Sequence, residues 1–230
     1  MKKEIVFSVH QPNFLPWLGY FNKIAESDVF VILDDVLIPR GTSIANKNRI
    51  LTSNGILELT FPISHPKGNN RLTAYKDVLF VDDKSKQKIL KTIQSSYSKS
   101  PFYDEVYPFI EQVFEANSFC ELNETFIIEL CKKFELKTQI LKMSDLEVEG
   151  AKNELIVGIG KKVEGTVYLS GTGAKSYNDP AYFKEHNIEL IYQNYSPLEY
   201  TQYNSKVFNK NLSVIDYLFN QGFVWPVLIS

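Results

Sequence analysis

The sequence predicts an α/β fold with a mainly parallel sheet, built on a βαβ unit at the start of the chain. Residues 5–9 and 28–33 are short apolar runs typical of buried strands. Between them, residues 16–26 carry apolar side chains at helical spacing, and Pro16 suits a first helical turn. A strand, a helix and a strand within about 30 residues predict parallel strands joined by a right-handed crossover.

An antiparallel hairpin and a helical lobe are expected to follow this unit. Residues 46–63 hold two strand-like runs on either side of Asn54 and Gly55, a pair favoured in a type I′ turn. Over residues 83–137 the apolar spacing becomes helical, which predicts three helices in one compact lobe. Pro101 and Pro108 are the expected helix starts, and residues 117–123 are the expected break.

Strands and helices alternate again after the lobe and are expected to restore the α/β order. The predicted strands cover residues 138–143, 166–170 and 188–192. The predicted helices cover residues 151–164, 180–186 and 211–220. Three polar residues are expected only to cap and solubilise the last helix: Asn211, Ser213 and Asp216. Because no internal repeat or linker is found, residues 1–230 are expected to form one domain.

The composition excludes several classes of protein. With 230 residues and 44% hydrophobic side chains, the chain can bury a core, which excludes a disordered or fibrous protein. The formal charge of -2 provides no general cationic field, so nucleic acid is not an expected partner. No apolar run approaches the roughly 20 residues of a membrane helix, and the start of the chain is unlike a signal peptide. We therefore expect a cytoplasmic protein without membrane insertion.

Two cysteines are too few for a disulfide framework, and no nearby histidine completes a metal site. Cys120 and Cys131 are separated by about three helical turns, so both should lie on one buried helix face. No metal-binding residues are predicted, and the sequence indicates neither a particular cofactor nor an oligomeric state.

Residues 10–21 hold the densest group of residues suited to chemistry. His10 ends the first predicted strand. The prolines stiffen the following loop, and Gly19 allows a ligand to approach helical backbone amides closely. His10 is therefore a candidate catalytic residue. The alternative is a core histidine beside a proline-rich helix cap. The candidate substrate-binding residues of this segment are Gln11, Trp17, Gly19 and Tyr20.

Asp34 and Asp35 follow the second predicted strand, whose end should meet the end of the first strand at one sheet edge. With His10 they are candidate catalytic residues, suited to bind a metal, orient the histidine or accept sugar hydroxyls. Because neighbouring strand residues face opposite ways, one of the two should face the site, and the sequence does not distinguish them. The alternative for Asp35 is a surface position that ends the strand.

Of the 25 basic residues, 22 are lysine, and all three arginines lie in the first third of the chain. A guanidinium binds phosphate or carboxylate through a planar fork that lysine lacks, so the arginines are candidate ligand clamps. Arg49 is the first choice, beside Lys47 and Asn48 at the hairpin entrance, and all three are candidate substrate-binding residues. The alternative is a set of ordinary surface ion pairs, which applies also to Arg40 and Arg71.

A glycine-rich loop follows the predicted strand 166–170. Its backbone amides suit phosphate, with Lys175 as the counter-charge, although the loop lacks the spacing of a Walker A motif. The alternative is a tight connection between elements. If the strand joins the first sheet, this loop and His10 should share one edge. The candidate binding residues here are Ser170, Gly171, Gly173, Lys175 and Tyr177.

Four segments resemble the WbqC-like protein family, whose members are found among bacterial O-antigen and other surface-polysaccharide genes. These segments are HQPNFLPWLGYFNKIAESDVFVILDDV, NKNRI, YLSGTGAKSYND and NLSVIDYLFNQG. The resemblance spans almost the whole chain and implies an enzyme that transfers an acyl or aminoacyl group to a nucleotide-linked amino sugar. In that reaction His10 would be the base, the amides near Gly19 would bind the developing oxyanion, and Arg49 would hold the diphosphate.

Two other functions stay open. The histidine after the first strand and the later Leu-Ser-Gly loop are similar to features of nucleotidylyltransferase-like ligases, which activate a carboxylate with ATP and form an amide. Tyr20 stands near the place of their second motif histidine. The other alternative is a non-catalytic sugar-nucleotide-binding accessory protein, which binds its ligand without turnover. The expected partners are a nucleotide-linked sugar and an acyl or aminoacyl donor.

Overall fold

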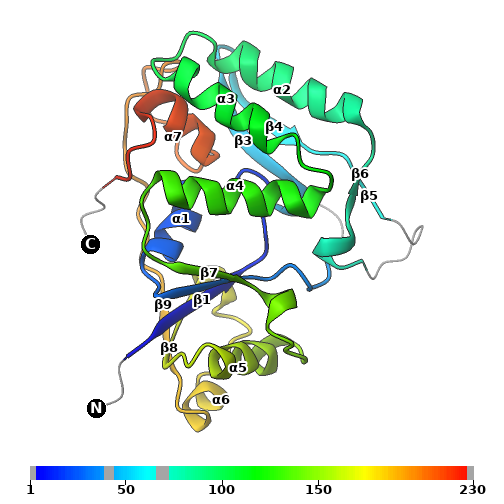
Figure 1. Ribbon diagram of the computed structural model, residues 1–230. Coiled ribbons are helices and arrows are strands. Elements are labelled where there is room, and N and C mark those ends of the chain that lie inside the picture. The colour runs from blue at the N-terminus through cyan, green and yellow to red at the C-terminus, as the bar shows by residue number, and fades with distance from the viewer. Residues whose placement is uncertain (1–3, 39–43, 66–72, 227–230) are drawn as a thin grey trace.

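A five-stranded parallel sheet forms the centre of the chain in a computed structural model, which describes residues 4–38, 44–65 and 73–226 (Figure 1). The strands stand in the order β7-β2-β1-β8-β9, and every neighbouring pair is parallel. The predicted α/β fold is therefore confirmed. The strand bounds are β1 Val6–His10, β2 Val29–Ile32, β7 Gln139–Lys142, β8 Val167–Ser170 and β9 Glu189–Tyr192.

The N-terminal βαβ unit has the predicted form. Helix α1 (Leu18–Ala25) joins β1 to β2, and these strands pair from Phe7 with Val29 to His10 with Ile32. The chain next adds β7 beyond β2, then returns to the other side of β1 for β8 and β9. In chain order, the sheet reads third, second, first, fourth and fifth strand, which is the order of doubly wound nucleotide-binding folds.

Helices cover both faces of the sheet, as a parallel sheet requires. Helices α1 and α4 (Phe119–Lys133) cover one face, and α5 (Lys152–Lys162) and α6 (Pro180–Glu185) cover the other (Figure 1). Successive residues of β2 alternate between two hydrophobic cores. Phe30 packs in the core on the α1 side and Val31 in the core on the α5 side. This alternation explains why the strand is apolar throughout.

The predicted hairpin is formed by β3 (Lys47–Thr52) and β4 (Gly55–Thr60). The prediction of a type I′ turn is wrong, because Asn54 does not have the positive φ that this turn needs. Gly55 instead takes the positive φ, +104°, which a residue without Cβ adopts at little cost. A second, shorter antiparallel pair is formed by β5 (Ile63–Ser64) and β6 (Leu79–Phe80).

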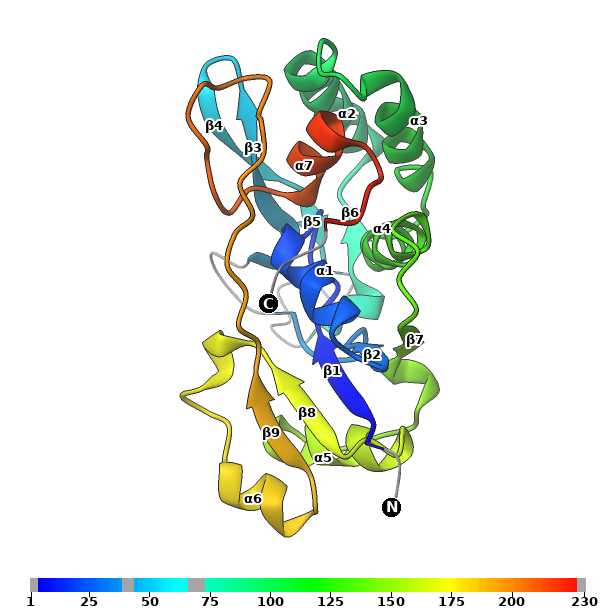
Figure 2. The same ribbon diagram turned by 90° about the vertical axis from the view of Figure 1, so that its left-hand side faces the viewer.

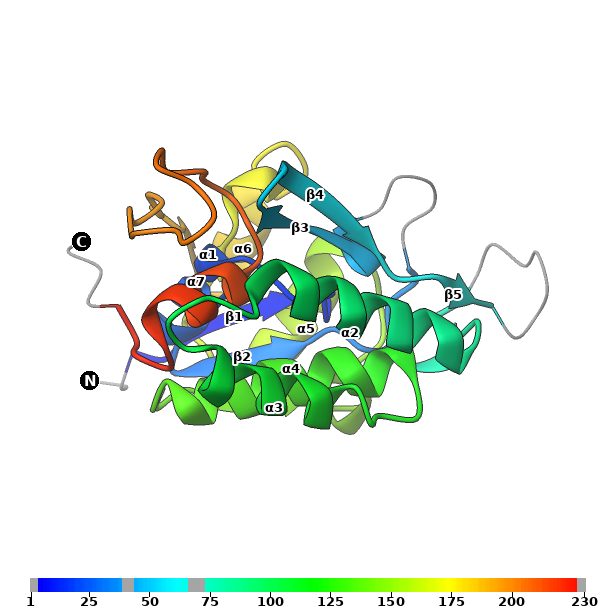
Figure 3. The ribbon, with the colours of Figure 1, turned by 90° about the horizontal axis from the view of Figure 1, so that it is seen from above.

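Three helices form the predicted lobe: α2 (Asp83–Tyr97), α3 (Tyr103–Val113) and α4. Seen from above, α2 lies between the hairpin and the other two helices (Figure 3). Asp82 caps α2 and Ser118 caps α4, each by accepting a hydrogen bond from the backbone N–H three residues later.

Two expectations about the lobe are wrong. Pro108 lies inside α3 rather than at its start, because the buried apolar residues on either side of it hold the helix against its neighbours. The break before α4 ends at Ser118, so Asn123 lies inside α4 and not in the interruption. Pro101 stands two residues before the first residue of α3, close to its expected place.

The end of the chain returns to the hairpin. The segment 193–211 runs from β9 past α1 to the hairpin (Figure 2), and α7 (Val214–Gln221) follows. Ser213 caps α7, as expected. Asp216 does not solubilise the helix, which corrects the prediction for this residue. It is buried and accepts hydrogen bonds from the hydroxyls of Tyr97 and Tyr200, each at 2.8 Å.

Cys120 and Cys131 are both buried on α4, as predicted. Among the described residues, every helix is too short or too polar for a membrane span.

Candidate functional site

The carboxyl ends of β1 and β8 form the topological switch point of the sheet. After β1 the chain turns to the face covered by α1, and after β8 it turns to the face covered by α6 (Figure 2). Doubly wound folds bind ligands where neighbouring strands send their connections to opposite faces. His10 is the last residue of β1 and Ser170 the last of β8, so two of the predicted site residues stand at this point.

The His10 side chain points toward α1. Its ring contacts the rings of Trp17 and Tyr20, with centroids 6.0 and 4.8 Å apart. The Nδ1 atom lies 3.1 Å from the carbonyl oxygen of Gln11. Because a carbonyl oxygen only accepts hydrogen bonds, Nδ1 carries the proton and Nε2 presents a lone pair.

His10 is held neutral by its surroundings. Burial, followed by the positive charge of Lys23, lowers the pKa of His10 from 6.5 to about 3. Lys23 is itself buried on α1, donates a hydrogen bond to the carbonyl oxygen of Val9 at 2.9 Å, and has its pKa lowered by burial to about 7. The sequence analysis missed Lys23, because a lysine on a helix is usually solvated. The signal is its place three residues after Tyr20 on a short helix buried almost all round.

The loop between β1 and α1 is held firmly. The carbonyl oxygen of Gln11 accepts hydrogen bonds from the backbone N–H of Asn13 at 2.9 Å and from the hydroxyl of Tyr20 at 3.0 Å. The carbonyl oxygen of Pro12 accepts one from the side-chain amide of Asn123 on α4 at 2.8 Å. The loop is therefore anchored to both α1 and α4, and its geometry is fixed before any ligand binds.

Close packing continues at the start of α1. A Cβ atom at Gly19 would lie 2.5 Å from the indole nitrogen of Trp17 and 2.7 Å from the ring of Tyr195, so only glycine fits. The carbonyl oxygen of Gly19 accepts a hydrogen bond from Gln193, which follows β9, at 2.8 Å. Leu15 has a φ of +41°, a strained conformation of the kind that often occurs at functional sites.

A cavity of about 250 Å³ lies beside this loop. Its lining comes from three segments far apart in the sequence: Asn13, Trp17, Lys47, Asn48, Arg49, Glu58 and Asn211. Four of the predicted binding residues are thus brought together. Because Trp17 contacts His10 and also lines the cavity, the cavity adjoins the switch point.

The polar groups around the cavity have different partners. The Lys47 ammonium lies 3.0 Å from the Glu58 carboxylate, and one guanidinium nitrogen of Arg49 donates to the carbonyl oxygen of Asn211 at 2.9 Å. Asn48 donates to the carbonyl oxygen of Leu15 at 2.6 Å, which holds the loop against β3. The other donors of Arg49 have no partner among the described residues, so this side chain keeps binding capacity for an anion.

Asn13 is a cavity residue that the sequence analysis missed. Its side chain is buried, and neither its amide nitrogen nor its amide oxygen has a hydrogen-bond partner in the described structure. The available signal is its position in the first resembling segment, directly after Pro12.

The structure gives the two aspartates separate partners. Asp34 is buried, and its carboxylate accepts hydrogen bonds from the backbone N–H and the hydroxyl of Ser144, just after β7. Asp35 is partly exposed and forms an ion pair with Lys76 at 2.7 Å. Neither forms a hydrogen bond with His10, so their catalytic partnership stays a prediction. In the described ranges, no three or more His, Cys, Asp or Glu side chains cluster closely enough to hold a metal ion.

The expectation that β8 joins the first sheet is confirmed, and the structure places it beside β1. The Ser170 hydroxyl is used within the protein, because it accepts a hydrogen bond from Asn178 at 2.9 Å. The Lys175 ammonium lies 5.1 Å from the centroid of the Tyr192 ring. Tyr177, by contrast, is mostly exposed.

The backbone of this loop is open. Nothing lies within 4 Å of the place where a Cβ would stand at Gly171 or Gly173. Neither glycine has a positive φ. Neither position therefore requires glycine to avoid a local clash, and a ligand has room to approach the backbone. Whether the loop shares a pocket with His10 stays a prediction.

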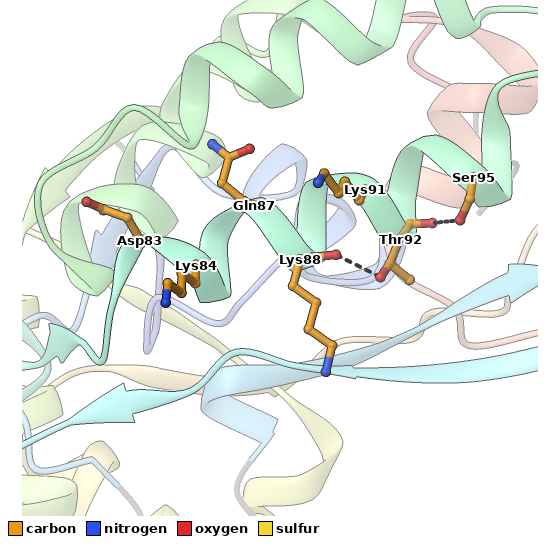
Figure 4. Close-up of a pocket in the computed structure, with 7 residues that line it drawn as sticks. All are labelled: Asp83, Lys84, Gln87, Lys88, Lys91, Thr92 and Ser95. Atoms are coloured by element: carbon orange, nitrogen blue, oxygen red, sulfur yellow. Dashed lines mark hydrogen bonds between the residues drawn. The ribbon is translucent and has the colours of Figure 1, made fainter.

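Two of the arginines lie outside the described residues: Arg40 and Arg71. A larger hollow of about 670 Å³ runs along α2 (Figure 4). It is lined by Asp83, Lys84, Gln87, Lys88, Lys91, Thr92 and Ser95. All these residues belong to one helix, and the lysines are spaced as on a solvated face. We assign it no part in the site.

The comparisons with known proteins agree with the resemblance of the four segments. The sequence model of the WbqC-like protein family matches residues 11–224. The chain belongs to the WbqC-like protein family. It is 27% identical to an uncharacterized protein of Mycobacterium tuberculosis over 225 residues, which are 96% of this chain and 95% of that protein. No solved structure matches.

The fold explains why the resembling segments are far apart in the sequence. Three of the four segments that resemble the WbqC-like family contribute to the cavity: the first supplies Asn13 and Trp17, the second Arg49, and the last Asn211. The remaining segment begins within β8 and continues through Gly171 into the loop after the strand. The segments therefore converge at the carboxyl edge of the sheet and at the adjoining cavity.

Proposed function

We propose that this WbqC-like chain is an enzyme of bacterial surface-polysaccharide biosynthesis that forms an amide on the amino group of a nucleotide-linked sugar, by acyl or aminoacyl transfer. The observation that carries the proposal is the place of His10 at the switch point of a doubly wound sheet, where Nδ1 donates to the carbonyl oxygen of Gln11. The strand order is typical of nucleotide-binding folds, and the lone pair on Nε2 is the proposed acceptor of the amine proton.

The proposed reaction uses the residues of both strand ends. The open backbone at Gly171 and Gly173 suits the diphosphate, with Lys175 as its counter-charge. The sugar amine attacks the carbonyl carbon of an activated acyl donor, such as a thioester. A C–N bond forms, the amine proton passes to Nε2 of His10, the C–S bond breaks, and the departing thiolate takes this proton from His10 and leaves as the thiol. In this proposal the first-turn amides of α1, near Gly19, stabilise the developing oxyanion.

A second candidate is an ATP-dependent, amide-forming ligase. The strand order favours it, because this order is typical of nucleotide binding in general and not of sugar nucleotides alone. Here ATP first activates the carboxylate, and the nucleotide or phosphate leaves when the amine attacks. Tyr20, near the place of the second motif histidine of such ligases, donates its hydroxyl to Gln11 and contributes no imidazole.

The test is product formation. The protein is incubated with UDP- and dTDP-linked amino sugars, together with either acetyl coenzyme A or an amino acid plus ATP, and mass spectrometry detects the amide. We expect product with the wild type, a loss of at least 100-fold with His10→Asn, and no change with Lys88→Ala on α2. Binding of the nucleotide sugar without product from either donor would instead indicate a non-catalytic accessory protein.

A further inference from the structure

Three strand ends stand next to one another at the switch point. Strands β1, β8 and β9 are neighbours in this order, and their carboxyl ends lie at the same edge of the sheet (Figure 2). Strand β8 stays paired with β9 up to Ser170 and Tyr192, and the backbone N–H of Gln193 then donates to the carbonyl oxygen of Ser170 at 2.8 Å. The residues that follow the two strands, Gly171 and Gln193, therefore lie beside each other.

His10 lies at the same level of the sheet. The pairing of β1 with β8 ends at Phe7 and Tyr168, and the residues three positions further along the two chains are His10 and Gly171. Neighbouring strands lie about 4.8 Å apart, so the backbones of His10 and Gln193 are at least ~10 Å apart, with Gly171 between them. This distance leaves room for one small group between the two side chains.

The three positions also share one face of the sheet. The core on the α5 side contains one residue from each strand: Val9, Tyr168 and Leu190. Side chains alternate along extended backbone, so His10, Gly171 and Gln193 face the α1 side. Nothing lies within 4 Å of the place where a Cβ of Gly171 would stand. Open space therefore lies above Gly171, with His10 on one flank and Gln193 on the other.

Each flank presents one unpaired acceptor. Nδ1 of His10 donates to Gln11, which leaves the lone pair on Nε2. The side-chain nitrogen of Gln193 donates to the carbonyl oxygen of Gly19 at 2.8 Å, which fixes the orientation of the amide and leaves its Oε1 without a partner among the described residues. In the described ranges, unpaired side-chain atoms shut off from solvent belong only to three other residues: Asn13, His65 and Asn123. A ligand can therefore reach both acceptors.

We infer that Gln193 is the specificity-determining residue for the attacking amine of the proposed reaction, and the inference rests on that reaction. A neutral amine has two hydrogens and one lone pair. The lone pair forms the C–N bond with the acyl carbon, and one proton passes to Nε2 of His10. The other N–H donates to Oε1 of Gln193 and stays on the nitrogen as the N–H of the amide product.

This arrangement selects an amine over a hydroxyl group. A hydroxyl group has one hydrogen, which Nε2 of His10 accepts. Its remaining lone pair would then face Oε1 of Gln193, so that two acceptors oppose each other. Sites built to hydrogen-bond a group of the substrate discriminate strongly against analogues that lack it, because the protein group is left unpaired. The site should therefore bind an amino sugar and reject the sugar that has a hydroxyl group in the same place.

Calorimetric titration without an acyl donor tests this selectivity. The probes are UDP- and dTDP-linked amino sugars, each paired with the nucleotide sugar that carries a hydroxyl group in place of the amine. The titrations are made at pH 8.5, so that much of the amine is neutral. We expect at least one amino sugar to bind about tenfold or more tightly than its hydroxyl partner. Equal affinities within every pair, or tighter binding of the hydroxyl sugars, would overturn the inference.

Two variants show whether Gln193 is the source of the selectivity. Gln193→Met removes the acceptor and should bring the affinities for the two sugars of a pair within about twofold of each other. Gln193→Glu keeps an acceptor oxygen but cannot donate to Gly19, so it should retain a preference for the amine of about fivefold or more. Gln87→Met, the same substitution on the exposed face of α2, is the matched control and should behave as the wild type. Equal loss of the preference in Gln193→Met and Gln193→Glu would show that Gln193 only holds α1 in place.

Product analysis separates this inference from the proposed function. A preference for amino sugars that depends on Gln193, without product from any donor, would contradict the proposed reaction and leave the recognition of the amine standing. Amide formation that Gln193→Met leaves unchanged would contradict the role of Gln193 alone.

Discussion

Burial decides the charge of two side chains at the end of β1. The pKa of His10 is lowered to about 3, and the pKa of Lys23 is lowered to about 7. The two residues titrate in separate pH ranges in the folded chain, so their contributions to stability can be measured separately. While it is charged, Lys23 also opposes the protonation of His10.

His10 should make the protein less stable in mild acid. The unfolded chain protonates this histidine below its ordinary pKa of 6.5, whereas the folded chain does so only below about 3. The free energy of unfolding should therefore fall between pH 6.5 and 3, by up to ~1.4 kcal/mol per pH unit. Urea denaturation at pH 7, 6 and 5 should show a shallower decline in His10→Asn. Identical declines would mean that His10 titrates normally.

Lys23 should change the stability of the protein in a different pH range, above pH 7. Its folded pKa of about 7 lies below its ordinary value of 10.5, so the folded chain holds fewer protons than the unfolded chain between these pH values. The free energy of unfolding should rise with pH from about 7 to 10.5 and should gain nothing from Lys23 below pH 7. Lys23→Met should remove this rise, which denaturation at pH 7 and 9 would detect. A rise of equal size in Lys23→Met would exclude Lys23 as its source.

The two neighbouring aspartates should differ in their effect on stability. Asp34→Ala removes a buried acceptor of two hydrogen bonds from Ser144, which should cost about 1–3 kcal/mol. Asp35→Ala removes a partly exposed ion pair with Lys76 and should cost less than about 1 kcal/mol. Urea denaturation of the two variants provides matched measurements. Equal losses would contradict these assignments.

The sequence could not distinguish these aspartates, for a physical reason. Strand alternation predicts that Asp34 and Asp35 face opposite ways, but the partner of Asp34 is 110 residues away. Ser144 becomes its neighbour only because β7 pairs with β2. The same holds for Asp216, whose partner Tyr97 is 119 residues away.

Substitution of Gly171 tests the function of the loop after β8 directly. No atom lies within 4 Å of the place where a Cβ would stand, and the φ of −71° is ordinary for any residue. Gly171→Val should therefore fold with a melting temperature within about 2 °C of the wild type, a shift equal to less than ~1 kcal/mol. Its affinity for a nucleotide-linked amino sugar should fall at least tenfold, because the side chain blocks approach to the backbone.

Gly19→Ala is the contrasting control for that experiment. It should destabilise the chain by about 1–3 kcal/mol, because the added methyl group would overlap Trp17 and Tyr195. Unchanged ligand affinity in a stable Gly171→Val variant would show that the loop does not bind the ligand and only connects β8 to α6.

Most elements could be predicted because their signals are local. Apolar runs and helical spacing located the five strands of the sheet and the helices of the lobe. The failures occur where tertiary contacts outweigh local preference. Packing accommodates Pro108 inside α3. In the hairpin turn Gly55 has a positive φ, whereas Asn54 does not.

The order of the strands in the sheet decides which loops of the molecule lie side by side. The sequence predicts that β1 and β8 share a sheet, but not that they are neighbours, since pairing of distant strands leaves no local pattern. The cavity is equally non-local, because its lining comes from the loop after β1, from the hairpin and from the segment before α7. The unpaired amide of Asn13 becomes visible only in the folded chain.

Hydrogen exchange measured with and without a nucleotide-linked amino sugar tests whether the switch point is the ligand site. UDP- and dTDP-linked amino sugars are each added at saturating concentration, and exchange is followed by mass spectrometry. We predict slower exchange in residues 10–13 and 170–175, at the ends of β1 and β8, and no change along α2. Protection confined to α2, or unchanged exchange at both strand ends in the presence of bound ligand, would show that the ligand does not bind at the switch point.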